Sequence, residues 1–165
     1  MRVRALAAVI VVAAMTVSSA GAQTPAKKTT APAKGASGRI IPITGDDTMK
    51  YSVVSITAKP GEQLTVRLTN KGSMPRVAAA HNFVLLTKGA SVTAFTMAAV
   101  MAQATDYVPA DPKNKALVLA ASKLAGPGET VEVTFKAPAT PGAYDYICSF
   151  PGHSATMAGK LTVAP

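Results

Sequence analysis

Short alternating segments next to Pro-Gly turns are the feature that most restricts how this chain can fold. The turn at residues 59–62 (KPGE) precedes the alternating run 64–68 (LTVRL), and the turn at 126–129 (GPGE) precedes a similar run at 131–135 (VEVTF). Alternation with a period of two indicates a half-buried β-strand, and Pro-Gly pairs mark where strands begin or end. The same reasoning predicts further strands at residues 40–43, 51–58, 82–86, 115–120, 144–148 and 161–163.

Residues 91–103 interrupt this β pattern. One helical face would contain Val92, Phe95, Ala99 and Ala102, which predicts a helix of about three turns. Met97 and Met101 are expected to pack in the core, because methionine is a common gap-filler there. The predicted fold class is all-β: a two-sheet antiparallel Greek-key sandwich of about eight strands with one helical insertion near residues 91–103.

The N-terminal 38 residues are expected to lie outside this domain. Residues 1–22 combine a basic start, an uncharged apolar run and a small-x-small cleavage signal, which is the pattern of a secretory signal peptide. The apolar run falls short of the roughly 18 residues of a membrane helix, so we expect no stable membrane insertion after cleavage. Residues 23–38 are an Ala/Pro/Lys-rich flexible linker. The domain is predicted to span residues 39–165 of an exported protein, soluble and located in the periplasm.

The charge distribution argues against nucleic acid as a partner. The whole chain has a formal net charge of +9, of which two positive charges fall in the signal peptide and three in the linker. The remaining Lys and Arg residues are scattered singly, whereas nucleic-acid binding requires them to cluster on one face.

Residues 148–157 (CSFPGHSATM) contain three side chains that bind soft or borderline metals. Cys148, His153 and Met157 have the spacing Cys-x4-His-x3-Met, and the enclosed Pro-Gly forces a turn that can fold them around one point. Two nitrogens, one thiolate and a weak axial thioether are the ligands of a blue-copper site. The second nitrogen can come only from His81, because the chain has two histidines.

Taken singly, these residues have simpler explanations. A lone histidine is usually structural, and a lone cysteine in an exported protein is usually disulfide-bonded or buried. Here the only cysteine and both histidines fall on one ligand pattern, which favours copper over a copper-free adhesion sandwich. A copper oxidase or nitrite reductase needs a second site with more histidines, so the inventory argues against an enzyme.

The chain resembles the cupredoxins, the type 1 blue copper proteins, and within them the azurins most closely. The resemblance covers residues 43–163 and rests on three segments: 44–49 (TGDDTM), 74–85 with its MPR and HNFVL motifs, and the loop 148–157. It also places a helical insertion near residue 91. The disulfide near the N-terminus of azurins cannot form here, because the chain has one cysteine.

The resemblance implies one type 1 copper per chain, held by His81, Cys148 and His153 with Met157 as the weak axial ligand. The backbone carbonyl of Ala80, where azurins usually have glycine, is expected on the opposite axial side. Asn82 is expected to tie the two ligand loops together beside the sulfur.

The resemblance also implies a function, namely a soluble carrier of single electrons. The expected partners are redox proteins such as a c-type cytochrome or a terminal reductase or oxidase, which dock on an apolar rim around His153. The rim is expected to consist of Met49, Ala78, Ala79, Phe150 and Pro151. The alternative is a periplasmic copper chaperone or buffer without electron transfer; it would favour exposed methionines and histidines, which the linker lacks.

Overall fold

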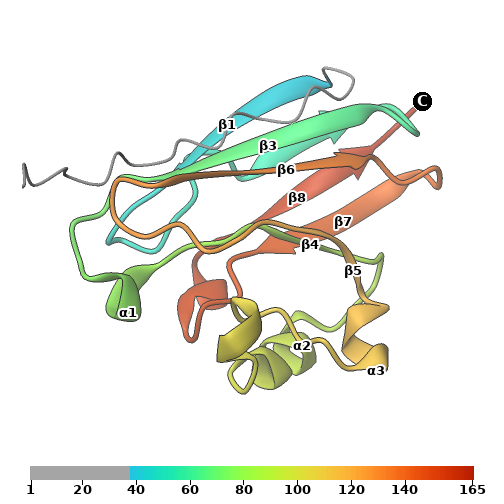
Figure 1. Ribbon diagram of the computed structural model, residues 1–165. Helices are drawn as coiled ribbons and strands as arrows, with labels where there is room; N and C mark the ends of the chain where they lie inside the picture. Colours follow the sequence, from blue (N-terminus) through green and yellow to red (C-terminus); the bar gives the residue numbers. More distant parts are fainter. Residues whose placement is uncertain (1–37) are drawn as a thin grey trace, which may run out of the picture. The chain divides into compact units, whose positions relative to one another are not determined.

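The structure, a computed structural model, describes residues 38–165. The predicted signal peptide at 1–22 and all but the last residue of the predicted linker at 23–38 lie outside these residues. The described part contains two sheets, which face each other with the apolar core between them (Figure 1). No helix among residues 38–165 is long and apolar enough to cross a bilayer.

The smaller sheet has three strands in the order β1-β3-β6, and the larger has five in the order β2-β8-β7-β4-β5. The strands are β1 (Arg39–Gly45), β2 (Ser55–Ala58), β3 (Gln63–Asn70), β4 (Val84–Leu86), β5 (Val118–Ala121), β6 (Thr130–Lys136), β7 (Gly142–Ile147) and β8 (Ala158–Val163). The prediction of an all-β, two-sheet sandwich with about eight strands is therefore confirmed.

The strand pairing is mixed rather than wholly antiparallel. β1 pairs with β3, and β2 pairs with β8, in parallel, whereas the other strand pairs are antiparallel. The parallel β1–β3 pair arises because the chain crosses to the other sheet as β2 before it returns as β3. β3 therefore runs in the same direction as β1.

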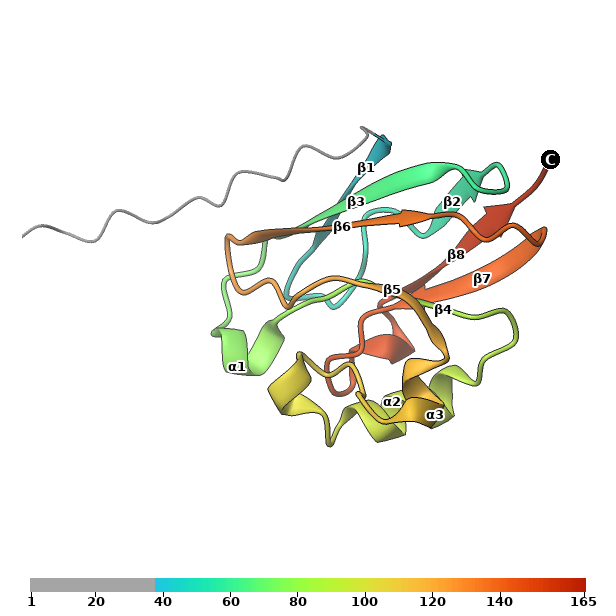
Figure 2. The same cartoon turned by 45° about the vertical axis from the view of Figure 1, so that its right-hand side comes forward.

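Three α-helices and two 3₁₀ turns occupy the connections: α1 (Arg76–Ala79), α2 (Val92–Ala99), η1 (Gln103–Thr105), α3 (Pro112–Lys115) and η2 (His153–Ala155). In both views the red turn η2 lies at the same end of the sandwich as α1 and α2 (Figure 2). The predicted helix at 91–103 is confirmed in place but is shorter, because a separate 3₁₀ turn follows it. The short helix α3 begins at Pro112 and is capped by the side chain of Asp111.

β4 is buried on both faces, and this burial explains its unbroken apolar sequence. Leu85 packs in the core between the sheets, whereas Val84 and Leu86 pack with Phe95 and Ala99 of α2 in a second cluster. α2 thus covers the outer face of the larger sheet, next to the end where His81 and Cys148 lie.

Candidate metal centre

Three separate segments bring the candidate ligands together at one end of the sandwich. His81 lies between α1 and β4, where its backbone N–H donates to the carbonyl of Ala125 at 3.0 Å and its carbonyl accepts from Ala125 at 2.7 Å. Cys148 directly follows β7, and His153 begins the turn η2. The predicted convergence of these three residues is therefore observed.

The three side chains form a tight and buried cluster. Nδ1 of His81 lies 3.2 Å from Nδ1 of His153, and the latter lies 3.6 Å from Sγ of Cys148. The ligand atoms of the three residues all lie within 4.8 Å of one another. The exposed fraction is 3% for His153 and 0% for the other two residues.

These distances fit a first-row transition metal. Zinc, an ion of similar size to copper, binds nitrogen at about 2.0 Å and thiolate at about 2.3 Å. Three such ligands at 120° would be separated by about 3.5 Å between the nitrogens and about 3.7 Å between nitrogen and sulfur. The observed 3.2 and 3.6 Å are close to these values. With one thiolate and two imidazoles, the donor set suits copper.

The His81 ring is oriented by a backbone group. Its Nε2 lies 3.1 Å from the carbonyl oxygen of Asp46, just after β1. A carbonyl can only accept, so Nε2 carries the proton and Nδ1 presents a lone pair to the cluster. Desolvation lowers the pKa of His81, although the hydrogen bond to Asp46 opposes this shift. The ring is therefore neutral at pH 7, as a metal ligand must be.

His153 reaches solvent through the edge that faces away from the cluster. Both of its polar contacts are made by Nδ1, and Nε2 has no hydrogen-bond partner within residues 38–165. Every fully buried polar side-chain atom in this part of the chain does have a partner, so Nε2 is not fully buried. Desolvation and the nearby His81 lower the pKa of His153 to about 4.

The cysteine is enclosed by backbone groups. Burial raises the pKa of the Cys148 thiol to about 11, and the backbone N–H groups of Asn82 and Phe150 oppose this rise only in part. Without metal the group is a thiol at pH 7, and metal binding must displace its proton.

Asn82 joins the two ligand segments, as expected. Its side-chain oxygen accepts the N–H of Ser149 at 2.9 Å, and its Nδ2 donates to Ser149 Oγ and to the Asp106 carbonyl, each at 2.9 Å. Asn82 itself is fully buried. The residue after His81 thereby holds the residue after Cys148 in place.

Met157 and Ala80, the two predicted axial ligands, are both fully buried. Met157 is fully buried and directly precedes β8, with its N–H bonded to His153 and its carbonyl to Cys148. Its methyl group and the His81 ring both lie beside Gly45. Ala80 is fully buried in an extended conformation, with φ −89° and ψ 156°. Their roles as ligands remain predictions.

The predicted apolar rim is only partly exposed. Met49 and Ala78 are exposed and Pro151 is half-buried, but Ala79 and Phe150 are buried, with exposed fractions of 3% and 8%. Ala79 closes the last turn of α1, and Phe150 packs against the His153 ring with centroids 4.6 Å apart.

The expectation that Met97 and Met101 pack in the core is wrong. Their exposed fractions are 72% and 88%. α2 buries Phe95 and Ala99, and Met97 follows Phe95 by two residues, or about 200° around the helix. Met97 and Val100 instead line a cavity of about 220 Å³ whose other wall is the loop from Ser149 to Ala155.

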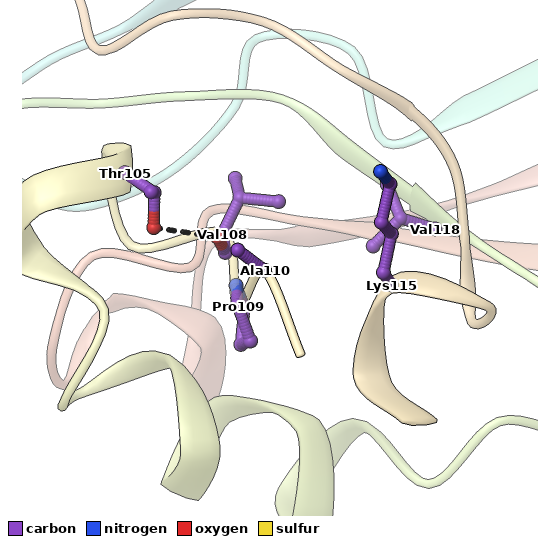
Figure 3. Close-up of a pocket in the computed structure, with 6 residues that line it drawn as sticks. All are labelled: Thr105, Val108, Pro109, Ala110, Lys115 and Val118. Carbon is purple, nitrogen blue, oxygen red and sulfur yellow. Dashed lines mark hydrogen bonds between the residues drawn. The ribbon is translucent and has the colours of Figure 1, made fainter. Parts of the chain in front are cut away.

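A larger cavity of about 390 Å³ lies away from the cluster. Figure 3 shows its lining, which comes from the end of η1 and the segment after it, and from α3 and β5. The lining residues are Thr105, Val108, Pro109, Ala110, Lys115 and Val118. None is a candidate ligand, so cavity size does not indicate the chemistry in this fold.

Sequence reasoning missed the contacts made by the end of β1. The segment 44–49 was used as a motif of the family resemblance, but neither the Asp46 carbonyl contact nor the space beside Gly45 was predicted. Any residue type can supply a backbone carbonyl, so the sequence carried no signal for the Asp46 contact. For the space beside Gly45 there was one weak signal, a glycine at the end of an apolar strand.

Comparison with known proteins agrees with this geometry. Residues 41–164 match the family model described as copper binding proteins, plastocyanin/azurin family. Auracyanin-A from Chloroflexus aurantiacus is 38% identical over 117 residues, which cover 70% of this chain and 67% of the relative. Azurin from Achromobacter denitrificans is 38% identical over 125 residues, which cover 74% and 82%.

Solved structures give the same result. Auracyanin A, described as a "blue" copper protein, matches with a TM-score of 0.68 and 37% identity, covering 76% of this chain and 98% of that one. An azurin from Methylomonas sp. strain J matches with a TM-score of 0.67 and 32% identity, covering 78% and 100%. The chain therefore belongs to the plastocyanin/azurin family of copper-binding proteins, the cupredoxins, and its cofactor is one type 1 copper.

Proposed function

We propose that this protein is a mobile carrier that passes single electrons between redox partners. The observation that carries the proposal is the buried His-Cys-His cluster, whose ligand atoms lie within 4.8 Å of one another. His81, Cys148 and His153 are proposed as the trigonal ligands, Met157 as the weak axial ligand and the Ala80 carbonyl as the opposite axial contact. Bound copper supplies the chemistry by cycling between Cu(I) and Cu(II).

The role of the protein is to keep the ligands still while the charge changes. Cu(I) and Cu(II) prefer different geometries, and movement between them slows electron transfer. Here the Asp46 carbonyl orients His81, Asn82 holds the segment after Cys148, and Phe150 packs on His153. Such outer contacts fix ligand orientation and also exclude water.

The electron is proposed to leave through His153. Its Nε2 edge reaches solvent, whereas the other proposed ligand side chains are fully buried. Exposed apolar residues at this end include Met49, Met74, Val77, Met97 and Val100. An apolar surface suits brief docking of a partner, for which a c-type cytochrome or a terminal reductase or oxidase is proposed.

Export to the periplasm is proposed from the sequence of residues 1–22 alone. A role without catalysis follows from the histidine inventory, because both histidines are assigned to a single site.

The proposal is tested by electron exchange with a soluble c-type cytochrome as probe. Copper-loaded protein is reduced and mixed with ferricytochrome c in a stopped-flow instrument. Rapid oxidation of the copper protein, without loss of copper, is the expected result. A carrier role is contradicted if exchange is slow or if each reduction releases copper.

Exposed methionines favour a second candidate, a copper chaperone or buffer. Residues 38–165 contain five methionines, and all except Met157 have exposed side chains. Thioethers are preferred ligands of Cu(I). A chaperone would release Cu(I) readily to a competing chelator such as bicinchoninate, whereas a carrier would retain it in both oxidation states.

A further inference from the structure

The last residue of β1 lies against two of the proposed copper ligands. A Cβ atom built on Gly45 would lie less than 3.0 Å from Cε of Met157 and 3.1 Å from Cδ2 of His81. We infer that Gly45 is a positioning residue, whose missing side chain leaves the space in which the Met157 thioether reaches the copper. This inference rests on the copper site proposed above.

Space, rather than backbone conformation, is what requires glycine here. The φ angle of Gly45 lies outside the left-handed region, unlike those of Gly61, Gly128 and Gly152. Gly45 pairs with Asn70 in the regular β1–β3 register. Alanine could adopt this backbone conformation without strain, so the obstacle is the contact with Met157 and His81.

The surrounding backbone cannot easily move to relieve that contact. The Gly45 carbonyl accepts the N–H of Lys71 at 2.7 Å, and Gly45 also forms a bridge to Tyr51. The Met157 backbone is held on both sides, by the His153 carbonyl at 2.8 Å and the Cys148 N–H at 2.9 Å. Relief must therefore come from a side chain.

Of the two side chains, Met157 is the one that would give way. The His81 ring is held through Nε2 by the Asp46 carbonyl, and a Cβ at 3.1 Å from it is tight but tolerable. The Met157 methyl is the end of a flexible side chain and would overlap more severely. In Gly45→Ala the thioether would have to rotate out of its axial position.

Loss of the Met157 thioether as a ligand should change the reduction potential of the copper. Withdrawing a ligand destabilises Cu(II) more than Cu(I), so the reduction potential should rise, as it does whenever the axial ligand weakens in such a site. The thiolate and imidazoles stay in place, so the intense charge-transfer band should remain.

The test compares four chains in the full-length protein: the parent, G45A, M157L and G45A/M157L. Leucine fills similar volume but has no Cε atom, so the double variant lacks the overlapping contact. G38A is the matched control. Gly38 lies just before β1, and its Cβ would crowd Gln63, the first residue of β3, away from the site. Reduction potential, copper hyperfine splitting by electron paramagnetic resonance, and the Met157 methyl NMR signal of the metal-free protein are measured.

We expect G45A and M157L to raise the potential in the same direction, with G45A adding little in the M157L background. G38A should match the parent. In the metal-free protein, G45A should shift the Met157 methyl signal and G38A should not. If G45A does not fold, recovery in G45A/M157L supports the same contact, and failure to recover overturns it.

If G45A folds, two results would overturn the inference: an unshifted Met157 methyl signal in G45A, or an equal change in potential in both backgrounds. A parent that forms no blue copper site would instead refute the proposed function. The metal-free NMR comparison would still decide whether Gly45 positions Met157.

Discussion

Replacing Asn82 with alanine should damage both the fold and the copper site. The side chain is fully buried and bonds to Ser149 N–H, Ser149 Oγ and the Asp106 carbonyl. Ser149 is itself 1% exposed, so water cannot replace the lost partner. Each buried polar group left without a partner costs about 1–3 kcal/mol. With two such groups on Ser149, N82A should lower the free energy of unfolding by roughly 2–6 kcal/mol.

The assay is urea denaturation of the metal-free protein, followed by copper titration of the folded variant. Disturbing residues that orient metal ligands typically weakens metal binding by about 10–100-fold. The matched control is S122A: Ser122 Oγ accepts the Phe83 N–H at 3.0 Å and donates to the Lys123 carbonyl, away from the ligands. S122A should lose stability by about 1–3 kcal/mol but keep the parent spectrum and copper affinity.

The reasoning is refuted if N82A costs less than about 1 kcal/mol and binds copper as the parent does. It is also refuted if S122A alters the spectrum as much as N82A, because the effect on copper would then follow from lost stability alone.

Three further predictions follow from the site and its surroundings. Copper binding near pH 7 should release about one proton, and the copper affinity should rise about tenfold per pH unit. The reason is that the pKa of Cys148 is raised to about 11, so its thiol must lose a proton, whereas the pKa of His153 is lowered to about 4, so its ring is already neutral. Calorimetry in buffers of different ionisation enthalpy measures the number of protons released, and a value of two or three would contradict the prediction. Y51F removes a buried hydroxyl that donates to the Asn82 carbonyl, so it should lower the free energy of unfolding, measured by urea denaturation, by about 1 kcal/mol. The copper spectrum should not change, and a loss of the blue band would contradict this prediction. M97K, beside the loop at 149–155, should slow electron exchange with cytochrome c at an unchanged potential, whereas L119K on β5 should not; equal rates in both variants would exclude docking over α2.

Local patterns in the sequence predicted most of the strands. The alternating runs at 64–68 and 131–135 became β3 and β6, and residues 91–103 did contain a helix. The four-residue helices α1 and α3 are too short to show a helical period, so the sequence did not predict them. The parallel β1–β3 and β2–β8 pairs were missed because pairing depends on how the chain crosses between the sheets.

The candidate site was likewise predicted only in part: the ligands were identified, but the contacts that support them were not. Cys148, His153 and Met157 lie within ten residues, so their convergence follows from one turn, and His81 was identified because only two histidines exist. The supporting contacts at Gly45 and Asp46 involve backbone atoms and empty space, which residue identity does not encode. The exposure of Met97 depends on which face of α2 meets the larger sheet, and methionine fits either face.

The most direct test of the account is the visible spectrum of the purified protein during Cu(II) titration, with C148S as the control. The account predicts an intense thiolate-to-copper charge-transfer band that saturates at one copper per chain and is absent from C148S. A weak spectrum that is the same in both proteins would show that Cys148 does not ligate copper, and it would contradict the type 1 site on which the proposed electron transfer depends.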